Sequence, residues 1–311
     1  MTNNPTPSVR NDVSEEADPS TLAASEATQA YLGLLETFWE RAQGMWDCLG
    51  KYWWYHTVDL GNGLVTPGCY DYRQSLSSFK FPPDMRGMRV LDVGSATGFF
   101  AFEFEQRGAD VTSVEVPSLS SLDCFPGDTL QDQLRKARIG LGNLGWMPIG
   151  ESVDHLFANS TPEEIYRNIL DGPFKFCHET LGSKVVRHYG RVYDLPKANL
   201  GPGGFDLVFA GDVLLHTINP LQALAALKEV CSGMLIIAQP MPELPEPGMR
   251  YIGGGTAGED GFAWWLADRV CLEQLLKKLG FKHVEVIGEY SGFMRPVGLP
   301  YKRTIVHAYR G

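Results

Sequence analysis

The stretch that decides the fold is Met88-Arg-Val-Leu-Asp-Val-Gly-Ser-Ala-Thr-Gly98. A short apolar run ends at Gly94, a second glycine follows at Gly98, and residues 99–105 then have the length and apolar character of a partly buried helix. A buried strand that enters a helix through a glycine turn places backbone amides against a ligand at the carboxyl end of a parallel sheet. The stretch therefore predicts an α/β fold with a ligand site at its first turn.

An acidic residue ends the next predicted strand, which covers residues 111–114. This residue, Glu115, lies 21 positions after Gly94. An acid about 20 positions after the glycine turn is placed to accept hydrogen bonds from both hydroxyls of a ribose. Glu115 therefore predicts an adenosine-type cofactor.

The glycine spacing and a second acid indicate which adenosine cofactor binds. Residues 99–101 (Phe-Phe-Ala) deny the third glycine of a dinucleotide fingerprint, so a nicotinamide-dependent oxidoreductase is disfavoured. Asp92 places another carboxylate near the loop, which would repel a pyrophosphate but suits a sulfonium and an ammonium group. S-adenosylmethionine carries both groups. We expect it to contact Asp92, Gly94, Ser95, Ala96 and Gly98.

At this point the chain resembles the class I methyltransferases, whose first motif reads V-L-D-V-G-x-x-x-G and whose second motif ends in an acid. The resemblance implies a Rossmann-like fold with a mixed, seven-stranded, doubly wound sheet. The rest of the chain fits this order of elements. Further strands are expected at 184–189, 205–210, 234–238, 284–287 and 304–308, and helices at 174–182, 221–230 and 270–279.

The end of the third predicted strand is expected to contact the adenine edge of the cofactor, where the resemblance places that contact. Asp194 can accept a hydrogen bond from the exocyclic amino group, while Val192 or Tyr193 can lie on the ring.

The end of the fourth predicted strand offers small residues and two polar ones. Ala210 and Gly211 let a cofactor pass close to the backbone at the carboxyl edge of the sheet. Asp212 either holds the amino group of the methionine moiety or caps the following turn. His216 either acts at the reacting centre or fixes the loop before Pro220.

An aromatic segment before the sheet, residues 53–68, predicts a hairpin with a glycine turn at 61–63. The run Trp54-Tyr55-His56 would expose half of its side chains on each face, giving stacking surface and titratable groups. The segment is expected to cover the methyl donor, so His56 is our first candidate for a general base. Tyr55 is a further catalytic candidate and His216 is the alternative base.

This segment and later motifs resemble the tRNA wobble-uridine (5-carboxymethoxyuridine) methyltransferase-like family. The shared elements are Trp54-Tyr-His56, Thr66-Pro-Gly68, Val213-Leu-Leu-His216 with Pro220-Leu221, and Trp264-Trp265. The chain departs from the tRNA enzymes at Leu215, where they carry tyrosine, and in 65–73, which lacks their lysine and offers only Arg73. A buried carboxylate without a cationic partner would be costly, so we expect plain rather than carboxylated S-adenosylmethionine.

The favoured function is methyl transfer to an oxygen or nitrogen of a small acceptor with a planar or aromatic body. Acceptor contacts are expected from Trp54, Arg73, Trp264 and Trp265. The alternatives are a tRNA wobble-uridine (carboxy)methyltransferase and a methyltransferase-like module that binds a partner without catalysis. The sequence leaves the oligomeric state open.

Composition limits the binding partners and the cellular location that we expect. The 311 residues carry a formal net charge of −10, which argues against tight nonspecific binding to a phosphate backbone. The six cysteines form no C-x-x-C pair, so we expect reduced thiols, no metal site and a cytoplasmic location. No run reaches the ~20 apolar residues of a membrane span. We expect a disordered tail at 1–27, a helix and hairpin at 28–83, and a methyltransferase domain at 84–311 with a cap insert at 117–172.

Overall fold

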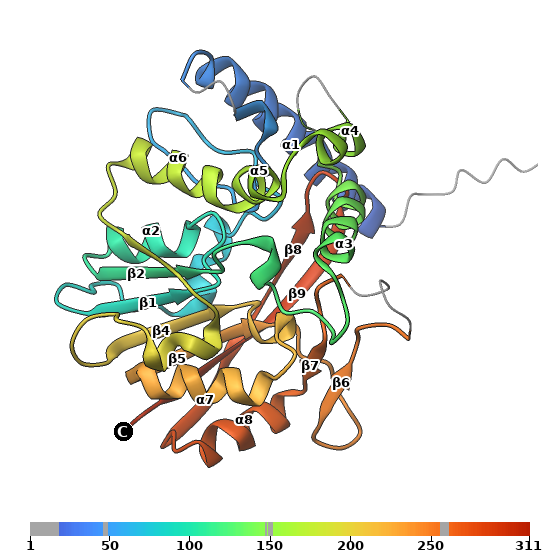
Figure 1. The fold of residues 1–311 in the computed structure, drawn as a ribbon. Coiled ribbons are helices and arrows are strands. Elements are labelled where there is room, and N and C mark those ends of the chain that lie inside the picture. Colours follow the sequence, from blue (N-terminus) through green and yellow to red (C-terminus); the bar gives the residue numbers. More distant parts are fainter. Residues whose placement is uncertain (1–18, 46–48, 147, 149–151, 256–260) are drawn as a thin grey trace, which may run out of the picture.

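The computed structural model describes residues 19–45, 49–146, 148, 152–255 and 261–311. Its main sheet has seven strands in the order β3-β2-β1-β4-β5-β9-β8 (Figure 1). Their bounds are β1 Arg89–Val93, β2 Asp110–Glu115, β3 Val186–Tyr189, β4 Phe205–Gly211, β5 Cys231–Gln239, β8 His283–Met294 and β9 Leu299–Tyr309. The first five strands pair in parallel, and β9 runs antiparallel to both β5 and β8. This arrangement confirms the predicted mixed seven-stranded sheet of a Rossmann-like α/β fold.

Strand order reverses at β1, which lies between β2 on one side and β4 on the other. In the register of β1 with β4, Asp92 lies beside Phe209 and Val93 beside Ala210. The two carboxyl ends therefore meet, and open sheets hold their ligands in the crevice outside such a reversal.

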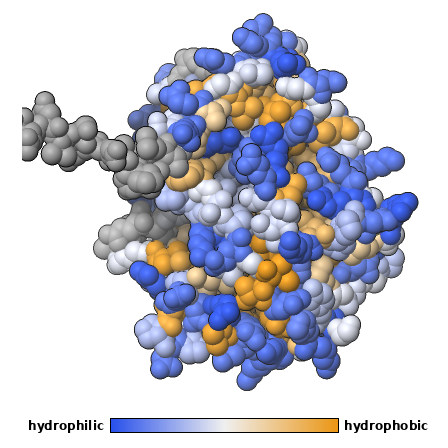
Figure 2. Space-filling view, turned by 180° about the vertical axis from the view of Figure 1, so that it is seen from behind, coloured by the Kyte–Doolittle hydropathy of each residue, from blue (hydrophilic) through white to orange (hydrophobic). Residues whose placement is uncertain are grey.

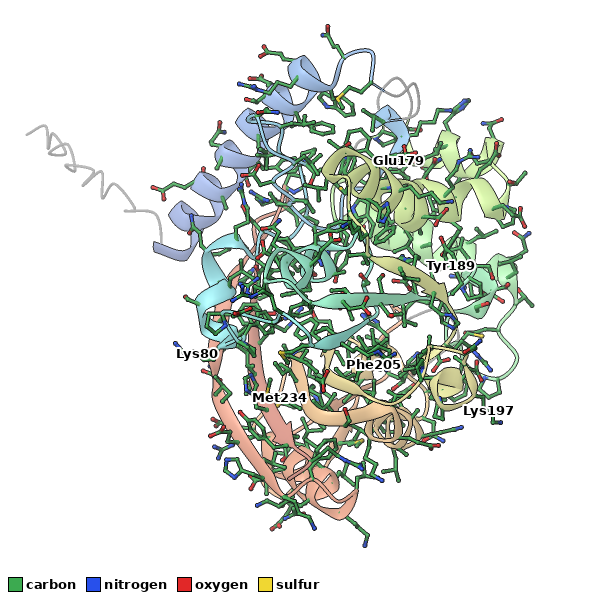
Figure 3. The ribbon with its side chains drawn as sticks, turned by 90° about the vertical axis from the view of Figure 1, so that its left-hand side faces the viewer. Lys80, Glu179, Tyr189, Lys197, Phe205 and Met234 are labelled. Atoms are coloured by element: carbon green, nitrogen blue, oxygen red, sulfur yellow. The ribbon has the colours of Figure 1, made fainter. Side chains whose placement is uncertain are left out.

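Helices cover both faces of the sheet (Figure 1). One core joins aromatic residues of α1 (Pro19–Ala42), α2 (Phe99–Gln106) and α6 (Gly172–Leu181) to one face. The other core joins α7 (Pro220–Val230) and α8 (Arg269–Lys278) to the opposite face. Side chains of neighbouring strands contribute to the two different cores. Phe205 of β4 belongs to the second core, while Met234 of β5 packs on the first (Figure 3).

The predicted insert, residues 117–172, contains helices and no strand within its described part. These are α3 (Leu130–Asn143), α4 (Val153–Asn159), α5 (Pro162–Tyr166) and the π-helical turn Arg167–Asp171, and they enclose a small core of their own. Thr161 caps α5 in a reciprocal capping box, with Pro162 in the first turn. The insert therefore packs as a helical unit over the carboxyl edge of β2.

Several boundaries differ from the expectations. Helix α1 begins at Pro19 rather than at residue 28, and most of the predicted tail, 1–18, lies outside the described residues. Strands β8 and β9 are longer than the predicted 284–287 and 304–308. A two-stranded sheet of β6 (Met249–Tyr251) and β7 (Trp265–Ala267) was not predicted, because three-residue strands leave little pattern. Short 3-10 turns cover Leu49–Lys51, Arg73–Phe79, Leu119–Ser121, Val192–Lys197 and Leu214–His216.

The predicted hairpin at 53–68 is wrong as two strands. The segment makes isolated bridges instead, antiparallel at Asp59–Val65 and parallel at His56–Tyr70. Pro67 has no N–H to continue a ladder, and the chain turns where the Gly68 N–H donates to the Thr66 carbonyl at 2.9 Å.

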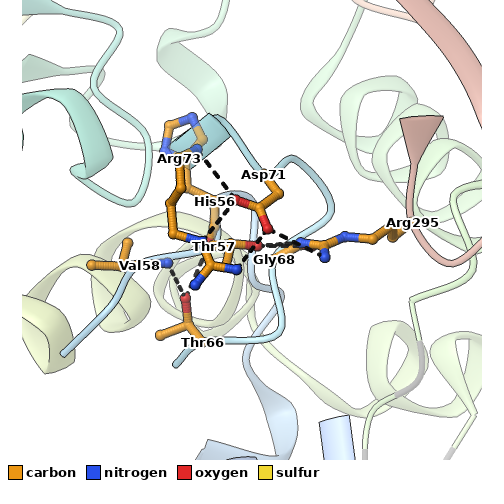
Figure 4. Close-up of polar contacts among 8 residues, drawn as sticks. All are labelled: His56, Thr57, Val58, Thr66, Gly68, Asp71, Arg73 and Arg295. Atoms are coloured by element: carbon orange, nitrogen blue, oxygen red, sulfur yellow. Dashed lines mark hydrogen bonds and ion pairs between the residues drawn. The ribbon is translucent and has the colours of Figure 1, made fainter. Parts of the chain in front are cut away.

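Arg295, after β8, ties this aromatic segment to the sheet (Figure 4). Its guanidinium donates to the Thr57 hydroxyl and, at 2.9 Å, to the Gly68 carbonyl, and it lies 3.5 Å from Asp71. Asp71 also pairs with Arg73, whose side chain is 37% exposed. The segment therefore depends on one buried and one partly exposed guanidinium.

Seen from behind, the surface is mostly hydrophilic, with hydrophobic residues in small patches (Figure 2). None of the helices in the described part of the chain combines the length and the apolar character that crossing a membrane requires.

Arg295 and Arg73 provide a matched test of whether the Arg295 contacts hold the aromatic segment on the sheet. Arg295→Lys should lower the free energy of unfolding by about 2 kcal/mol, because a lysine cannot replace several buried, charge-assisted hydrogen bonds. Arg73→Lys should change it by less than about 0.5 kcal/mol, because that pair is partly exposed. Urea denaturation monitored by tryptophan fluorescence measures both. Equal effects of the two substitutions would contradict the structural role of Arg295.

Candidate functional site

A cavity of about 560 Å³ lies at the carboxyl edge of the sheet. This volume falls in the range of small-molecule sites. Its walls come from the ends of β1, β2 and β4, the loop after β3, the insert, the aromatic segment and the β8–β9 pair. The cavity therefore lies at the reversal of strand order.

The first loop requires glycine at both predicted positions. Gly94 has φ +70°, and a Cβ there would meet the Val213 side chain at 2.8 Å. Gly98 has φ +90°, and a Cβ there would meet the ring of Phe102 at 2.7 Å. Positive φ strains other residues, so both the backbone and the packing select glycine. The loop can then turn directly from β1 into α2.

Glu115 is held in a fixed orientation at the end of β2. Its two carboxylate oxygens accept hydrogen bonds from the Ala96 and Val116 amides, each at 2.9 Å. Arg187 braces the same loop, because it donates to the Ala96 carbonyl at 3.1 Å and lies 4.0 Å from Glu115. Each carboxylate oxygen retains a lone pair, so Glu115 can accept further hydrogen bonds from a ligand in the cavity.

Asp92 presents a buried carboxylate to the same cavity. The residue is 1% exposed and its Oδ2 has no hydrogen-bond partner. Burial raises the pKa of Asp92 to about 7, because the charged form loses its hydration. A cationic ligand would supply the missing partner.

Asp212 and Arg303 form an ion pair in the lining of the same cavity. Asp212 follows β4 with φ +51°, and its carboxylate lies 2.8 Å from the Arg303 Nε. Burial raises the pKa of Asp212, and the Arg303 charge opposes that rise. Four tyrosines whose pKa is raised by burial line the same cavity: Tyr55, Tyr70, Tyr72 and Tyr290.

Helix α3 of the insert contributes to the cavity lining. Residues on one face of α3 line the cavity: Lys136, Ala137, Gly140 and Leu141. Below α3, Asp123 accepts hydrogen bonds from the Tyr193 hydroxyl and, at 2.8 Å, from the Ile218 amide. These bonds tie the insert to the loops after β3 and β4. The insert therefore encloses the site.

His56 lies in the cavity wall among aromatic rings. Its Nδ1 is buried without a partner, and burial lowers the pKa of the ring to about 3. Thr66 and Gly68 hold this segment: the Thr66 hydroxyl donates to the His56 carbonyl at 2.9 Å, and a Cβ at Gly68 would overlap the His56 backbone. Such a weakly basic ring is a poor proton acceptor at neutral pH, which does not support ranking His56 above His216.

His216 also lines the cavity, but its residue is exposed. Its Nδ1 lies 2.6 Å from the Phe262 carbonyl. When Nδ1–H donates to that oxygen, the neutral ring keeps a lone pair on Nε2. His216 is thus oriented and in contact with solvent, which suits proton exchange.

Eleven of the predicted site residues line this one cavity. They are Tyr55, His56, Asp92, Gly94, Ala96, Glu115, Val192, Tyr193, Gly211, Asp212 and His216. Ser95, Gly98 and Ala210 belong to the same loop and strand ends but are not among its lining residues.

The other predicted residues lie outside the cavity lining. Trp54 faces the core instead, edge-on to Phe38 and Phe176. Asp194 pairs with Arg191 at 3.2 Å on the surface. Arg73, as described above, pairs with Asp71.

The late tryptophan pair is structural in its contacts. Trp264 is 1% exposed, and its amide donates to the Leu215 carbonyl at 2.7 Å. The Trp265 indole N–H donates to the Ile218 carbonyl at 3.1 Å. Both therefore fix the loop after β4 and lie outside the lining of the cavity.

Sequence reasoning missed several lining residues, among them Trp53, Tyr70, Tyr72, Tyr290 and Arg303. The alternation Tyr70-Asp-Tyr72 was the one local signal, because it places two aromatic rings on the same side of an extended chain. Nothing local marks Arg303, which reaches the site only through the pairing of β9 with β5.

No family model matches the chain, and a search of curated proteins finds no match. Among solved structures, the chain is similar to magnesium protoporphyrin IX methyltransferase of Synechocystis PCC 6803 with bound SAM. That comparison has 12% identity and a TM-score of 0.43, over 94% of this chain and 98% of the other. The chain is also similar to the N-terminal domain of EvdMO1 with SAH bound, with 15% identity and a TM-score of 0.45, over 91% and 95%. Identities and TM-scores this low do not assign an activity.

The buried His56 ring should remain neutral through the physiological range. Its folded pKa of about 3 lies below the ordinary 6.5, so the unfolded chain binds more protons between these values. In that window His56 should lower the free energy of unfolding by about 1.4 kcal/mol per unit as the pH falls. NMR should show no titration of its ring between pH 5 and 8, with the resonance assigned through His56→Gln. A midpoint above pH 5 would contradict this environment.

Proposed function

We propose that the chain transfers the methyl group of S-adenosylmethionine to a small acceptor with a planar or aromatic body. The observation that carries the proposal is the pair of carboxylates, Glu115 and Asp92, presented to one cavity by adjacent parallel strands. Glu115 has a fixed orientation suited to ribose hydroxyls, and Asp92 has an oxygen without a hydrogen-bond partner suited to a cation. Few cofactors other than S-adenosylmethionine combine a ribose with a net positive side chain.

On this proposal the residues divide the cofactor between them. Glu115 holds the ribose, and Val192 and Tyr193 lie beside the adenine, since both line the cavity after β3. Asp92 and the Gly94 backbone hold the methionine end. On this arrangement the methyl group faces the tyrosines that line the same cavity.

The chemistry asks little of the protein beyond alignment. The sulfonium makes the methyl carbon electrophilic, and an acceptor lone pair displaces the thioether in line. The rings of Trp53, Tyr55 and Tyr72 exclude water around that path. His216, at the exposed side, can exchange a proton with solvent.

The charges of the lining support plain S-adenosylmethionine as the donor. Each cation among the described lining residues has a carboxylate partner: Lys136 with Asp128 at 2.6 Å, Arg191 with Asp194 at 3.2 Å, and Arg303 with Asp212 at 2.8 Å. A carboxylated donor would bring a further negative charge into this setting. A buried carboxylate without its own cation is costly.

Glu115→Ala should weaken binding of S-adenosylmethionine by about 1.5–3 kcal/mol, because hydrogen bonds to a charged acceptor are lost. Isothermal calorimetry measures the change. Glu103→Gln is the control, since Glu103 pairs with Arg107 on α2 and does not line the cavity. Unchanged affinity in Glu115→Ala would remove the assignment of the ribose site.

Plain S-adenosylmethionine should bind at least as tightly as its carboxylated form. Mass spectrometry of the nucleotide released from purified protein, after incubation with an equimolar mixture, reports the preference directly. Recovery of mainly the carboxylated nucleotide would reverse the donor assignment and favour the tRNA alternative.

A further inference from the structure

A buried guanidinium lies behind the wall of the cavity. Arg187 of β3 stands beside Ser113 of β2 in the register of the two strands, and neither residue lines the cavity. The Arg187 side chain is only 7% exposed. Its guanidinium donates to the Ser113 hydroxyl at 2.9 Å and lies 4.1 Å from the centre of the Phe174 ring. Contacts from β2 and from α6 therefore hold it in place.

This guanidinium supports the first loop in a strained conformation. Ala96 has φ +46°, in the left-handed region that an alanine rarely adopts. Its carbonyl accepts a hydrogen bond from Arg187 at 3.1 Å, while its amide donates to Glu115 at 2.9 Å. A residue stays in such a conformation only where its surroundings hold it there. Arg187 and Glu115 supply two of the contacts that do so.

Arg187 also places a positive charge behind the two carboxylates of the cavity. The guanidinium lies 4.0 Å from Glu115 Oε2, the oxygen that accepts from the Ala96 amide. Two ionised carboxylates, Glu115 and Asp92, and one guanidinium leave the group with one net negative charge. S-adenosylmethionine has a sulfonium, an ammonium and a carboxylate, and so carries one net positive charge. The charges of the site and of the donor are therefore complementary.

Resting on the proposed function, we propose that Arg187 is a positioning residue of the cofactor site. It keeps the Ala96 amide on Glu115, so that this carboxylate is oriented for the ribose hydroxyls. Its charge also offsets the repulsion between Glu115 and Asp92, so that both can face a cationic ligand. Arg187 acts through these residues, since it lies outside the cavity lining.

Groups from four parts of the fold act on the charge of Asp92. Burial raises the pKa of Asp92 to about 7, and Glu115 on β2 adds to the rise. Arg187 on β3, Ser95 in the first loop and the Ala101 amide of α2 oppose it. Removal of the Arg187 charge should therefore raise the pKa of Asp92 further, and the carboxyl would stay protonated to a higher pH.

Other titratable residues line the cavity from the aromatic segment and after β4. His56 stays neutral at neutral pH, because burial lowers its pKa to about 3. Asp212 is paired with Arg303 at 2.8 Å. His216 also lines the cavity, but it is the same in every variant compared below. A difference in pH dependence between Arg187 variants therefore reports on Asp92.

Calorimetry with S-adenosylmethionine between about pH 6 and 9 tests the proposal. Wild-type affinity should fall as the pH drops below about 7, because a protonated Asp92 no longer attracts a cation. Arg187→Met should weaken binding about tenfold at neutral pH. It should also move the midpoint of the fall upward by about one pH unit, because Asp92 takes up its proton earlier.

Arg187→Lys separates the charge from the hydrogen bonds. An ammonium keeps the positive charge but does not reproduce the planar fork that reaches both Ser113 and Ala96. This variant should therefore bind S-adenosylmethionine more weakly than the wild type and keep the wild-type midpoint. Loss of packing alone would not return the midpoint to its wild-type value.

Arg89→Met is the matched control. The Arg89 guanidinium lies 4.5 Å from the centre of the Phe205 ring and donates to the Leu200 carbonyl at 2.7 Å. The substitution thus removes a stacked, hydrogen-bonded guanidinium from the first residue of β1, outside the cavity lining. Arg89→Met should lower the melting temperature but leave both the affinity and the midpoint as in the wild type.

Ser113→Ala carries the test if Arg187→Met does not fold. It removes one anchor of the guanidinium and leaves the charge in place. The variant should weaken binding of S-adenosylmethionine about threefold, the scale of one hydrogen bond, without moving the midpoint.

Three outcomes overturn the proposal while the wild type binds the cofactor. They are wild-type affinity in Arg187→Met (or in Ser113→Ala in its place), an equal loss of affinity in Arg89→Met, and a midpoint in Arg187→Lys that moves as far as in Arg187→Met. Failure of the wild-type protein to bind S-adenosylmethionine at any pH would instead refute the proposed function, and this proposal with it.

Discussion

The reversal of strand order between β1 and β4 is the constraint on which the rest of the site depends. From β1 the chain returns to the sheet through α2 on one face, and from β4 it returns through α7 on the other. No connection can therefore cover the junction of the two carboxyl ends. The junction is left to the insert, the aromatic segment and the β8–β9 pair, which all contribute to the cavity lining there.

Enclosure makes charge expensive, and the chain offsets that cost unevenly. Glu115 is satisfied by two backbone amides, and both carboxylate oxygens of Asp212 lie 2.8 Å from the Arg303 Nε. Asp92 Oδ2 is left without a hydrogen-bond partner. A buried acceptor without a donor destabilises the empty protein. A ligand that supplies the donor therefore also stabilises the fold when it binds. A buried carboxylate oxygen that lacks a partner therefore favours a ligand with a positive charge.

Local sequence patterns predicted the fold, and they identified residues of β1, its loop and β2 that line one cavity. Asp92, Gly94 and Glu115 are recognisable because each lies at a strand end with a fixed offset in sequence. The lining from Tyr70, Tyr72 and the β8–β9 pair was not predicted, since these segments meet only after folding. Trp54 was misleading for a related reason: in an extended aromatic run, the sequence does not say which rings face the core.

The ties made by the β8–β9 pair also bear on the order in which the protein can assemble. Arg295 reaches back 238 residues to Thr57, and Arg303 reaches back 91 residues to Asp212. During synthesis, Thr57 and Asp212 both emerge long before their guanidinium partners. The aromatic segment and the Asp212 carboxylate therefore lack these partners in the interim. Contacts of such long sequence separation form late and slow the folding of a domain. A ribosome-bound chain that ends before β9 would have the first glycine turn and Glu115, but it would lack the cavity lining that Arg303 provides.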